Sequence, residues 1–295
     1  MLCLVQSLHS YTINHIRQIK VEHKIDTAKM PKILYGTAWK KERTTGLVSQ
    51  ALQAGFRGVD TACQPRHYAE ALVGDALIHS GIKREELFIQ TKFTPIDGQD
   101  LETVPYDKNA TLPEQVAESF EVSKKNLKTS YIDSLLLHSP LFPFSRLLSV
   151  WRAMEQLYKR GEVLQLGISN CYDLELLKRL YNEAKIKPAV VQNRFYSESD
   201  YDTELREWCK MHGIAYQSFW SLTANPHILG SETVIKLAMK YKKSTAQIFF
   251  AYLMSQGITP LSGTTSVEHM LDDLEAEEIN LKKEEIKEIN NLLHQ

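Results

Sequence analysis

Short apolar runs alternate with amphipathic stretches along the chain from Pro31 onward, a pattern typical of strands that are each followed by a helix. Eight runs are predicted to be strands: residues 32–38, 56–62, 87–93, 131–140, 163–170, 189–196, 214–220 and 258–263. Helical patterns between them include residues 43–55, 114–128, 148–161, 174–185 and 203–213. Three of these patterns end in a glycine that suits a left-handed helix C-cap: Gly55, Gly161 and Gly213. Continuous apolar strands followed by helices predict a parallel sheet that helices cover.

The number of these units indicates how the sheet closes. Eight strand–helix units fit an α/β fold of the (β/α)8 TIM-barrel type better than an open doubly wound sheet. An open dinucleotide-binding sheet needs a Gly-rich turn after its first strand, and residues 34–42 carry none. No linker-like stretch divides the chain, so we expect one barrel domain over residues 31–295 after an N-terminal extension at residues 1–30. The last helix, within residues 281–295, is expected to close the bottom or the side of the barrel.

Polar residues close five consecutive predicted strands, all at the same end. They are Asp60, Lys92, His138, the pair Ser169–Asn170, and Gln192. One polar residue at the rim of a barrel needs no function, but five at one end are hard to produce by packing alone. Active sites of this architecture lie at the carboxyl ends of the strands, so we expect the site there.

Asp60, Lys92 and His138 can carry out acid–base chemistry together with a tyrosine. A free phenol has a pKa of about 10 and transfers protons poorly near neutrality. A nearby ammonium lowers that pKa, and Asp60 would hold the Lys92 ammonium in place. A neutral His138 can orient a carbonyl oxygen between itself and the phenol. This set predicts protonation of a carbonyl oxygen as hydride reaches its carbon. The histidines lack HxH or HxxxH spacing, so we expect no metal.

Charge and cysteine content narrow the partners and the compartment. Lys and Arg number 35 against 36 Asp and Glu, without a basic block, so we expect no nucleic-acid partner. The four cysteines are scattered, which favours a reducing, cytoplasmic compartment. No apolar run is long enough to span a bilayer, and residues 1–30 lack a signal-peptide cleavage site, with a poor transit peptide as the alternative. The near-neutral charge balance and the lack of an obvious exposed apolar stripe favour a monomer.

Five segments, in this order along the chain, resemble the aldo-keto reductases: residues 55–77, 87–93, 131–140, 166–170 and 190–196. The resemblance runs from about Tyr35 to Leu274. It implies a (β/α)8 barrel that binds an extended nicotinamide dinucleotide without a Rossmann domain and reduces aldehydes or ketones. It places the catalytic tetrad on Asp60, Tyr68, Lys92 and His138. It also implies that Ser169, Asn170 and Gln192 bind the nicotinamide carboxamide.

The tyrosine is the first departure from the family pattern. The family tyrosine usually follows its aspartate by five positions, where this chain has Pro65, whereas Tyr68 lies eight positions on. Counting back from Glu70 puts the family tyrosine on His67 instead. We favour Tyr68 because only a phenol offers the required hydroxyl. The residues expected to line the substrate pocket are Trp39, His67 and Phe93.

The seventh strand and the segment after the eighth are the other departures. The family aromatic that stacks on nicotinamide aligns roughly with Ser218, and Phe219 or Trp220 would restore the platform after a shift. The family binds the adenosine 2′-phosphate after strand eight, often with a Lys and an Arg that this chain lacks. The residues expected to bind the cofactor there are Ser262, Gly263, Thr264, Thr265, Ser266, His269 and Asp273. Hydroxyls and a helix N-terminus near Ser266 favour NADP(H), while Glu268 and Asp272 oppose it. The alternatives are that the hydroxyls only cap the helix, and that NAD(H) is the cofactor.

Two other functions stay open on the sequence alone. One is a Schiff-base lyase with Lys92 as nucleophile, which a neighbouring Asp60 argues against. The other is a cofactor-binding regulatory protein that has lost turnover because its tyrosine is displaced. Residues 94–115 form a long segment after the third strand that we expect to hang over the barrel mouth.

Overall fold

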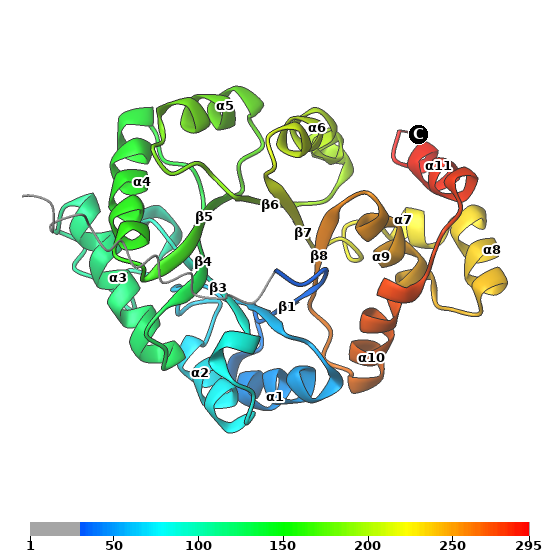
Figure 1. Ribbon diagram of the computed structural model, residues 1–295, viewed down its shortest axis with the longest axis horizontal. Helices are drawn as coiled ribbons and strands as arrows, with labels where there is room; N and C mark the ends of the chain where they lie inside the picture. Colours follow the sequence, from blue (N-terminus) through cyan, green and yellow to red (C-terminus); the bar gives the residue numbers. More distant parts are fainter. Residues whose placement is uncertain (1–29, 295) are drawn as a thin grey trace, which may run out of the picture.

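The computed structural model describes residues 30–294, and its strands form a closed barrel (Figure 1). Each strand runs parallel to its two neighbours, from β1 round to β8 and back to β1. The strands are β1 (Leu34–Gly36), β2 (Gly58–Asp60), β3 (Phe88–Phe93), β4 (Ile132–Leu137), β5 (Val163–Ser169), β6 (Val190–Arg194), β7 (Ala215–Phe219) and β8 (Ile258–Ser262). The predicted TIM barrel is confirmed, and every strand lies inside the range expected for it. The predicted N-terminal extension lies, except for Met30, outside the described residues.

Helices surround the barrel on its outer face (Figure 1). They are α1 (Thr44–Ala54), α2 (Glu70–His79), α3 (Leu112–Leu127), α4 (Phe144–Lys159), α5 (Leu174–Glu183), α6 (Thr203–Met211), α7 (Pro226–Leu229), α8 (Glu232–Tyr241), α9 (Thr245–Ser255), α10 (Val267–Glu275) and α11 (Lys283–Leu292). Short 3-10 helices span Lys41–Arg43, Arg84–Glu86, Ile96–Gly98, Ser197–Asp202 and Ala276–Glu278. No helix within residues 30–294 is long and apolar enough to cross a membrane.

The strands are buried on both faces, because side chains fill the barrel and helices cover it. All six residues of β3 and all six of β4 are buried, including polar residues such as Gln90 and Lys92 of β3 and Asp133 of β4. Gly167 in β5 shows how closely the strands pack. A Cβ atom there would lie 2.5 Å from Leu136 Cδ2 and 2.6 Å from the carbonyl oxygen of Val190, so only glycine fits.

The glycines predicted to end helices do so. Gly161 follows α4 with a φ of 74°, and Gly213 follows α6 with a φ of 67°, both in the left-handed region that glycine adopts without strain. These glycines turn the chain from each helix directly into the next strand.

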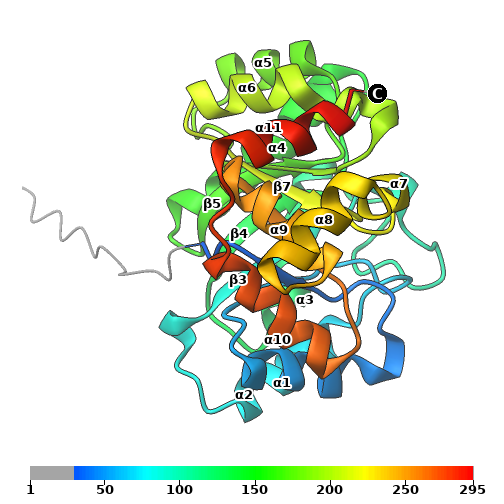
Figure 2. The same ribbon diagram turned by 90° about the vertical axis from the view of Figure 1, so that its right-hand side faces the viewer.

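The last helix, α11, covers the side of the barrel, where it packs against α8 and α9 (Figure 2). Tyr241 of α8 donates a hydrogen bond to a carboxylate oxygen of Glu285 at 2.7 Å, and Lys240 forms an ion pair with the same side chain. The Tyr252 hydroxyl of α9 donates to Asn290 Oδ1 at 3.1 Å. Of the two positions expected for this helix, the side is the one observed.

Candidate active site

A cavity of about 1120 Å³ opens at the carboxyl ends of the strands. The tip of each strand except β3 and β4 contributes lining residues, and His138 follows β4 directly. The predicted site residues that line the cavity are Trp39, Asp60, His67, Tyr68, His138, Ser169, Asn170, Gln192, Phe219, Trp220, Ser262, Gly263, Thr264, Thr265, His269 and Asp273. The barrel therefore brings most of the predicted site together in one space.

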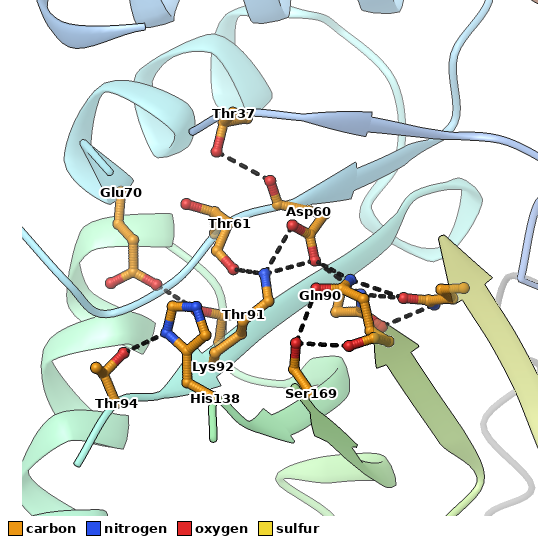
Figure 3. Close-up of polar contacts among 12 residues, drawn as sticks. Thr37, Asp60, Thr61, Glu70, Gln90, Thr91, Lys92, Thr94, His138 and Ser169 are labelled. Atoms are coloured by element: carbon orange, nitrogen blue, oxygen red, sulfur yellow. Dashed lines mark hydrogen bonds and ion pairs between the residues drawn. The ribbon is translucent and has the colours of Figure 1, made fainter. Parts of the chain in front are cut away.

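Asp60 and Lys92 form a buried ion pair beneath this cavity (Figure 3). Lys92 Nζ lies 2.8 Å from Asp60 Oδ1 and 2.7 Å from Oδ2, and it also donates to the carbonyl oxygen of Thr61 at 2.9 Å. Burial lowers the pKa of Lys92, and the Asp60 carboxylate opposes that shift. With two carboxylate oxygens and a carbonyl around it, the amine is held as a charged donor and is badly placed to act as a Schiff-base nucleophile.

Two glutamines inside the barrel hold Asp60 from the other side, and a third glutamine links those two. Gln90 Nε2 donates to Asp60 Oδ1 at 2.7 Å, and Gln192 Nε2 donates to the same oxygen at 3.0 Å. The same two amide nitrogens also donate to Gln217 Oε1, at 2.7 and 2.9 Å. This network could not be predicted from the strand ends, because Gln90 and Gln217 lie in the interior of their strands.

Tyr68 lies between the ion pair and His138. Lys92 Nζ is 5.3 Å from the centroid of the Tyr68 ring, and the Tyr68 and His138 rings are 6.0 Å apart and nearly perpendicular. Burial and the Asp60 carboxylate raise the pKa of Tyr68. We expected Lys92 to lower it, but Asp60 neutralises the ammonium at close range. The phenol therefore stays protonated, which suits a proton donor.

His67, the alternative to Tyr68, faces the rim instead. Its ring lies 3.9 Å from the Trp39 ring, and its Nδ1 is 2.9 Å from Gln64 Oε1. The backbone of Trp39 donates to the carbonyl oxygen of His67 at 2.8 Å, which fixes the two loops against each other. Burial and the neighbouring Arg66 lower the pKa of His67. His67 and Trp39 thus form one wall of the cavity, with 57% of Trp39 exposed.

His138 is held as a neutral ring. Its Nδ1 lies 2.7 Å from Thr94 Oγ1, so the threonine hydroxyl fixes the orientation of the imidazole. Burial lowers the pKa of His138 to about 3, with smaller contributions from Lys92 and His67. A neutral imidazole in this position can direct its other nitrogen to a carbonyl oxygen in the cavity.

The ends of β5 and β6 provide the polar groups assigned to the carboxamide. Ser169 Oγ donates to the carbonyl oxygen of Gln192 at 2.8 Å, and Asn170 Nδ2 donates to that of His138 at 2.8 Å. Asn170 adopts a left-handed backbone, with a φ of 54°, which asparagine tolerates better than most residues. The two amide hydrogens of Gln192 are used by Asp60 and Gln217. Its oxygen accepts only a long hydrogen bond from Ser169, at 3.5 Å, and keeps a lone pair for a further donor.

On β7, the stacking residue is not Ser218. Ser218 is fully buried, and its Oγ accepts a hydrogen bond from Ser221 at 2.9 Å. Strand alternation points Ser218 away from the cavity, which Phe219 and Trp220 line instead. The aromatic side chains that line the cavity at β7 are therefore the two expected from a shifted register.

The segment after β8 fits the prediction in part. Ser262 Oγ donates to Asp273 Oδ2 at 2.5 Å, and burial raises the pKa of Asp273 to about 6. Ser266 does not line the cavity, because it is the N-cap of α10 and its Oγ accepts from the backbone of His269 at 3.3 Å. The cap interpretation is thus correct for Ser266, while Thr264 and Thr265 line the cavity.

Phe93 and the segment at residues 94–115 do not reach the cavity. Phe93 is 1% exposed, and its ring lies 5.7 Å from the Tyr106 ring in the core. Tyr106 in turn donates to the carbonyl oxygen of Thr94 at 2.8 Å, so the segment folds back onto the end of β3. The expectation that Phe93 lines the substrate pocket is therefore wrong, and so is the expectation that residues 94–115 cover the substrate.

Three cations in the cavity were missed by sequence reasoning. Lys40 and Arg43 follow β1, and Arg194 closes β6. Lys40 Nζ donates to the carbonyl oxygen of Gly263, so the segment after β1 lies against the segment after β8. The segment after β8 lacks the Lys and Arg that the family often has there, but Lys40 and Arg43 bring two cations to the same part of the cavity. Lys40 could have been predicted as a site residue, because it directly follows Trp39 just beyond the end of the first strand.

Among the residues that the structure describes, no three His, Cys, Asp or Glu side chains group as a metal site would require. A dinucleotide fits the chemistry of the cavity better. Amide and hydroxyl groups lie at the β5 and β6 ends, aromatic faces at β7, and cations beside the segment after β8.

Comparisons with known proteins agree with this arrangement. Residues 32–294 match the model of the Aldo/keto reductase family. Glyoxal reductase of Bacillus subtilis (strain 168) is 30% identical over 248 residues, which are 84% of this chain and 83% of that protein. Methylglyoxal reductase DkgA of Yersinia pestis is 29% identical over 271 residues, 90% of each chain.

Solved structures give the same result. An aldo-keto reductase enzyme from a Medee basin deep-sea metagenome library matches with a TM-score of 0.78 at 30% identity, over 90% of this chain and 92% of that one. An aldo-keto reductase of Bombyx mori, solved in complex with NADP, matches with a TM-score of 0.73 at 26% identity, over 89% of both chains.

Proposed function

The chain belongs to the aldo/keto reductase family, and from that premise we propose that it reduces aldehydes or ketones to alcohols with NADP(H). The observation that carries the proposal is the buried Asp60–Lys92 pair below Tyr68, with a neutral His138 beside it. These are a proton donor, its charged support and an orienting imidazole at one end of one cavity.

Tyr68 gives its hydroxyl proton to the carbonyl oxygen of the substrate. Lys92 stabilises the phenolate that forms, because its ammonium lies 5.3 Å from the ring centroid. Asp60 and the glutamines behind it hold the ammonium during this change of charge. His138 orients the carbonyl oxygen, with its ring fixed by Thr94.

The dinucleotide, when bound, supplies the hydride that reaches the carbonyl carbon. Ser169, Asn170 and the oxygen of Gln192 are the groups that would hold its carboxamide, and Phe219 would stack against the nicotinamide ring. The phosphates would meet Lys40 and Arg43 together with the amides and hydroxyls of residues 263–265. These cations support NADP(H) over NAD(H).

Small dicarbonyl compounds are the first substrates to test. Two relatives are named for the reduction of glyoxal and methylglyoxal. The monomeric state and the cytoplasmic location expected from composition remain predictions.

The test is consumption of NADPH with glyoxal, methylglyoxal and a panel of larger aldehydes, with the variants Tyr68→Phe and His67→Ala beside the parent. We expect Tyr68→Phe to lower kcat about 100- to 10,000-fold, the usual contribution of a positioned acid. His67→Ala should retain most of kcat and raise KM, since His67 only lines the cavity. Full activity of Tyr68→Phe together with inactive His67→Ala would move the acid to His67.

A further inference from the structure

Arg194 is a cation without an acidic partner at the catalytic end of the cavity. Its guanidinium carbon lies 4.2 Å from the centroid of the Trp220 ring and 5.0 Å from that of Tyr196. Its backbone N–H is bonded to the Tyr172 hydroxyl at 3.1 Å, but no carboxylate within residues 30–294 pairs with its side chain. Arg84, partly buried away from the cavity, instead donates to Asp133 at 2.6 Å. The charge of Arg194 is thus uncompensated.

Stacking leaves the guanidinium ready to bind an anion. The aromatic rings contact its face and restrain the side chain, while the N–H donors along its edges remain free. A planar guanidinium with free edges matches the geometry of a carboxylate, to which it can donate two parallel hydrogen bonds. Because the side chain is already held in place, little conformational entropy is lost when the anion binds.

The position of Arg194 relates it to the reacting centre. Arg194 lies two residues beyond Gln192 on β6, so both side chains project to the same side of the strand. Gln192 is the residue that donates to Asp60, so Arg194 lies one layer above the catalytic ion pair. Among the residues that the structure describes, the acids that line the cavity are Asp60, which Lys92 neutralises, and Asp272 and Asp273 of α10. The catalytic end therefore carries a net positive charge.

The phosphates of the dinucleotide are the other anions to consider. Lys40 and Arg43 follow β1, and going round the barrel from β1 through β8 and β7 leads to β6. Lys40 contacts the segment after β8, where the proposed phosphate groups lie, whereas Arg194 lies by the carboxamide groups of β5 and β6. Lys40 and Arg43, and not Arg194, are thus the cations placed to bind the cofactor phosphates.

We propose that Arg194 binds a carboxylate of the substrate, so that the preferred substrates are aldehydes or ketones that also carry a carboxylate group. This inference rests on the proposed function. The carboxylate takes no part in the reaction: the carbonyl carbon gains hydride from the reduced dinucleotide, the carbonyl oxygen gains the Tyr68 proton, and the dinucleotide leaves oxidised. Arg194 determines which carbonyl compounds bind.

The test compares 4-carboxybenzaldehyde with its neutral methyl ester, which presents the same aldehyde without the charge. We expect kcat/KM to favour the acid by about tenfold to hundredfold, the range of charge-assisted hydrogen bonds. Arg194→Met should bring this ratio to about one, mainly through KM. Arg179→Met is the matched control, because Arg179 also stacks on an aromatic ring, 4.0 Å from the Phe144 centroid, but does not line the cavity.

Three results would overturn the proposal. The parent enzyme could show no preference for the acid, or Arg194→Met could keep the preference of the parent. Alternatively, Arg194→Met could lower both kcat/KM values equally and weaken NADPH binding, which would assign Arg194 to the cofactor diphosphate. Unfolding transitions of both variants establish that they are folded.

Failure of the proposed function would be visible separately. If neither compound is reduced with NADPH or NADH, the reductase assignment fails while the anion site is still testable. Benzoate is then titrated against the fluorescence of the protein, since Trp220 lies directly against Arg194. Saturable binding in the parent and in Arg179→Met that is lost in Arg194→Met supports the site, and no binding to the parent contradicts it.

Discussion

Lys92 Nζ lies within 2.8 Å of both carboxylate oxygens of Asp60, yet neither residue is more than 2% exposed. The ion pair is closed off from the cavity on the Lys92 side, because Asp60 lines the cavity and Lys92 does not. Under the proposed function, Lys92 would therefore influence the reaction through the Tyr68 ring, without direct access to the cofactor.

Replacing Lys92 should separate turnover from cofactor binding. We expect Lys92→Met to lower kcat about 100- to 10,000-fold, because the Tyr68 phenolate loses its stabilising charge. The Kd for NADPH, measured by fluorescence titration, should change little. A large loss of NADPH affinity would make Lys92 a cofactor residue.

The same substitution leaves the buried Asp60 charge without its partner, which destabilises a fold by roughly 3–5 kcal/mol. The control is the double variant Lys92→Met with Asp60→Asn, which removes the charge. It should regain stability in urea unfolding but not activity. Recovery of kcat along with stability would mean that the single variant had lost turnover through unfolding.

His138 should not titrate in the physiological range. Because burial lowers its pKa to about 3, the ring is neutral at any pH well above that value. The pH profile of kcat at saturating cofactor should therefore show no break from His138 between about pH 5 and pH 8. A break near the ordinary histidine pKa that is present in the parent and absent from His138→Gln would contradict this assignment.

The fold could be predicted from the sequence because each barrel strand is marked by the apolar pattern of its own short segment. A polar residue, His138, directly follows the apolar end of β4, and the closed barrel brings such strand ends together whatever their separation along the chain. Asp60, Lys92 and His138 could therefore be assigned from strand ends alone.

The parts of the site that depend on contacts between distant loops could not be predicted. Lys40 contacts Gly263, 223 residues away, and no periodicity encodes that pairing. Register was the other difficulty: a shift of one residue on β7 exchanges Ser218 for Phe219, because neighbouring side chains of a strand point to opposite faces. The prediction that Phe93 lines the substrate pocket failed because of the same alternation. Lys92 points into the barrel, so its neighbour Phe93 points outward toward the helices.

Asp273 should make the protein less stable at neutral pH than at acidic pH. Burial raises its pKa from 3.8 to about 6, so the folded state holds a proton that the unfolded state releases earlier. The resulting loss in the free energy of unfolding is absent below pH 3.8 and grows between pH 3.8 and about 6. Above that it reaches about 3 kcal/mol. Asp273→Asn, which can still accept from Ser262, should thus be more stable than the parent by up to about that amount near pH 8, but not near pH 4.

Urea unfolding at the two pH values measures this difference, with the adjacent and less buried Asp272→Asn as the control. A gain for Asp273→Asn that is equal near pH 4 and near pH 8 would show that the titration of the carboxyl is not its origin.

The cations after β1 should set the choice between NADPH and NADH. Arg43 lines the same cavity as Thr264 and Thr265, whereas Lys41, two residues before it, does not. We expect a kcat/KM ratio of NADPH to NADH above one in the parent, and Arg43→Leu should lower it about tenfold, as the loss of a charge-assisted hydrogen bond predicts. Lys41→Met should leave it unchanged. A parent ratio at or below one would instead assign NAD(H) as the cofactor, and an equal effect of both substitutions would mean that only the general surface charge matters.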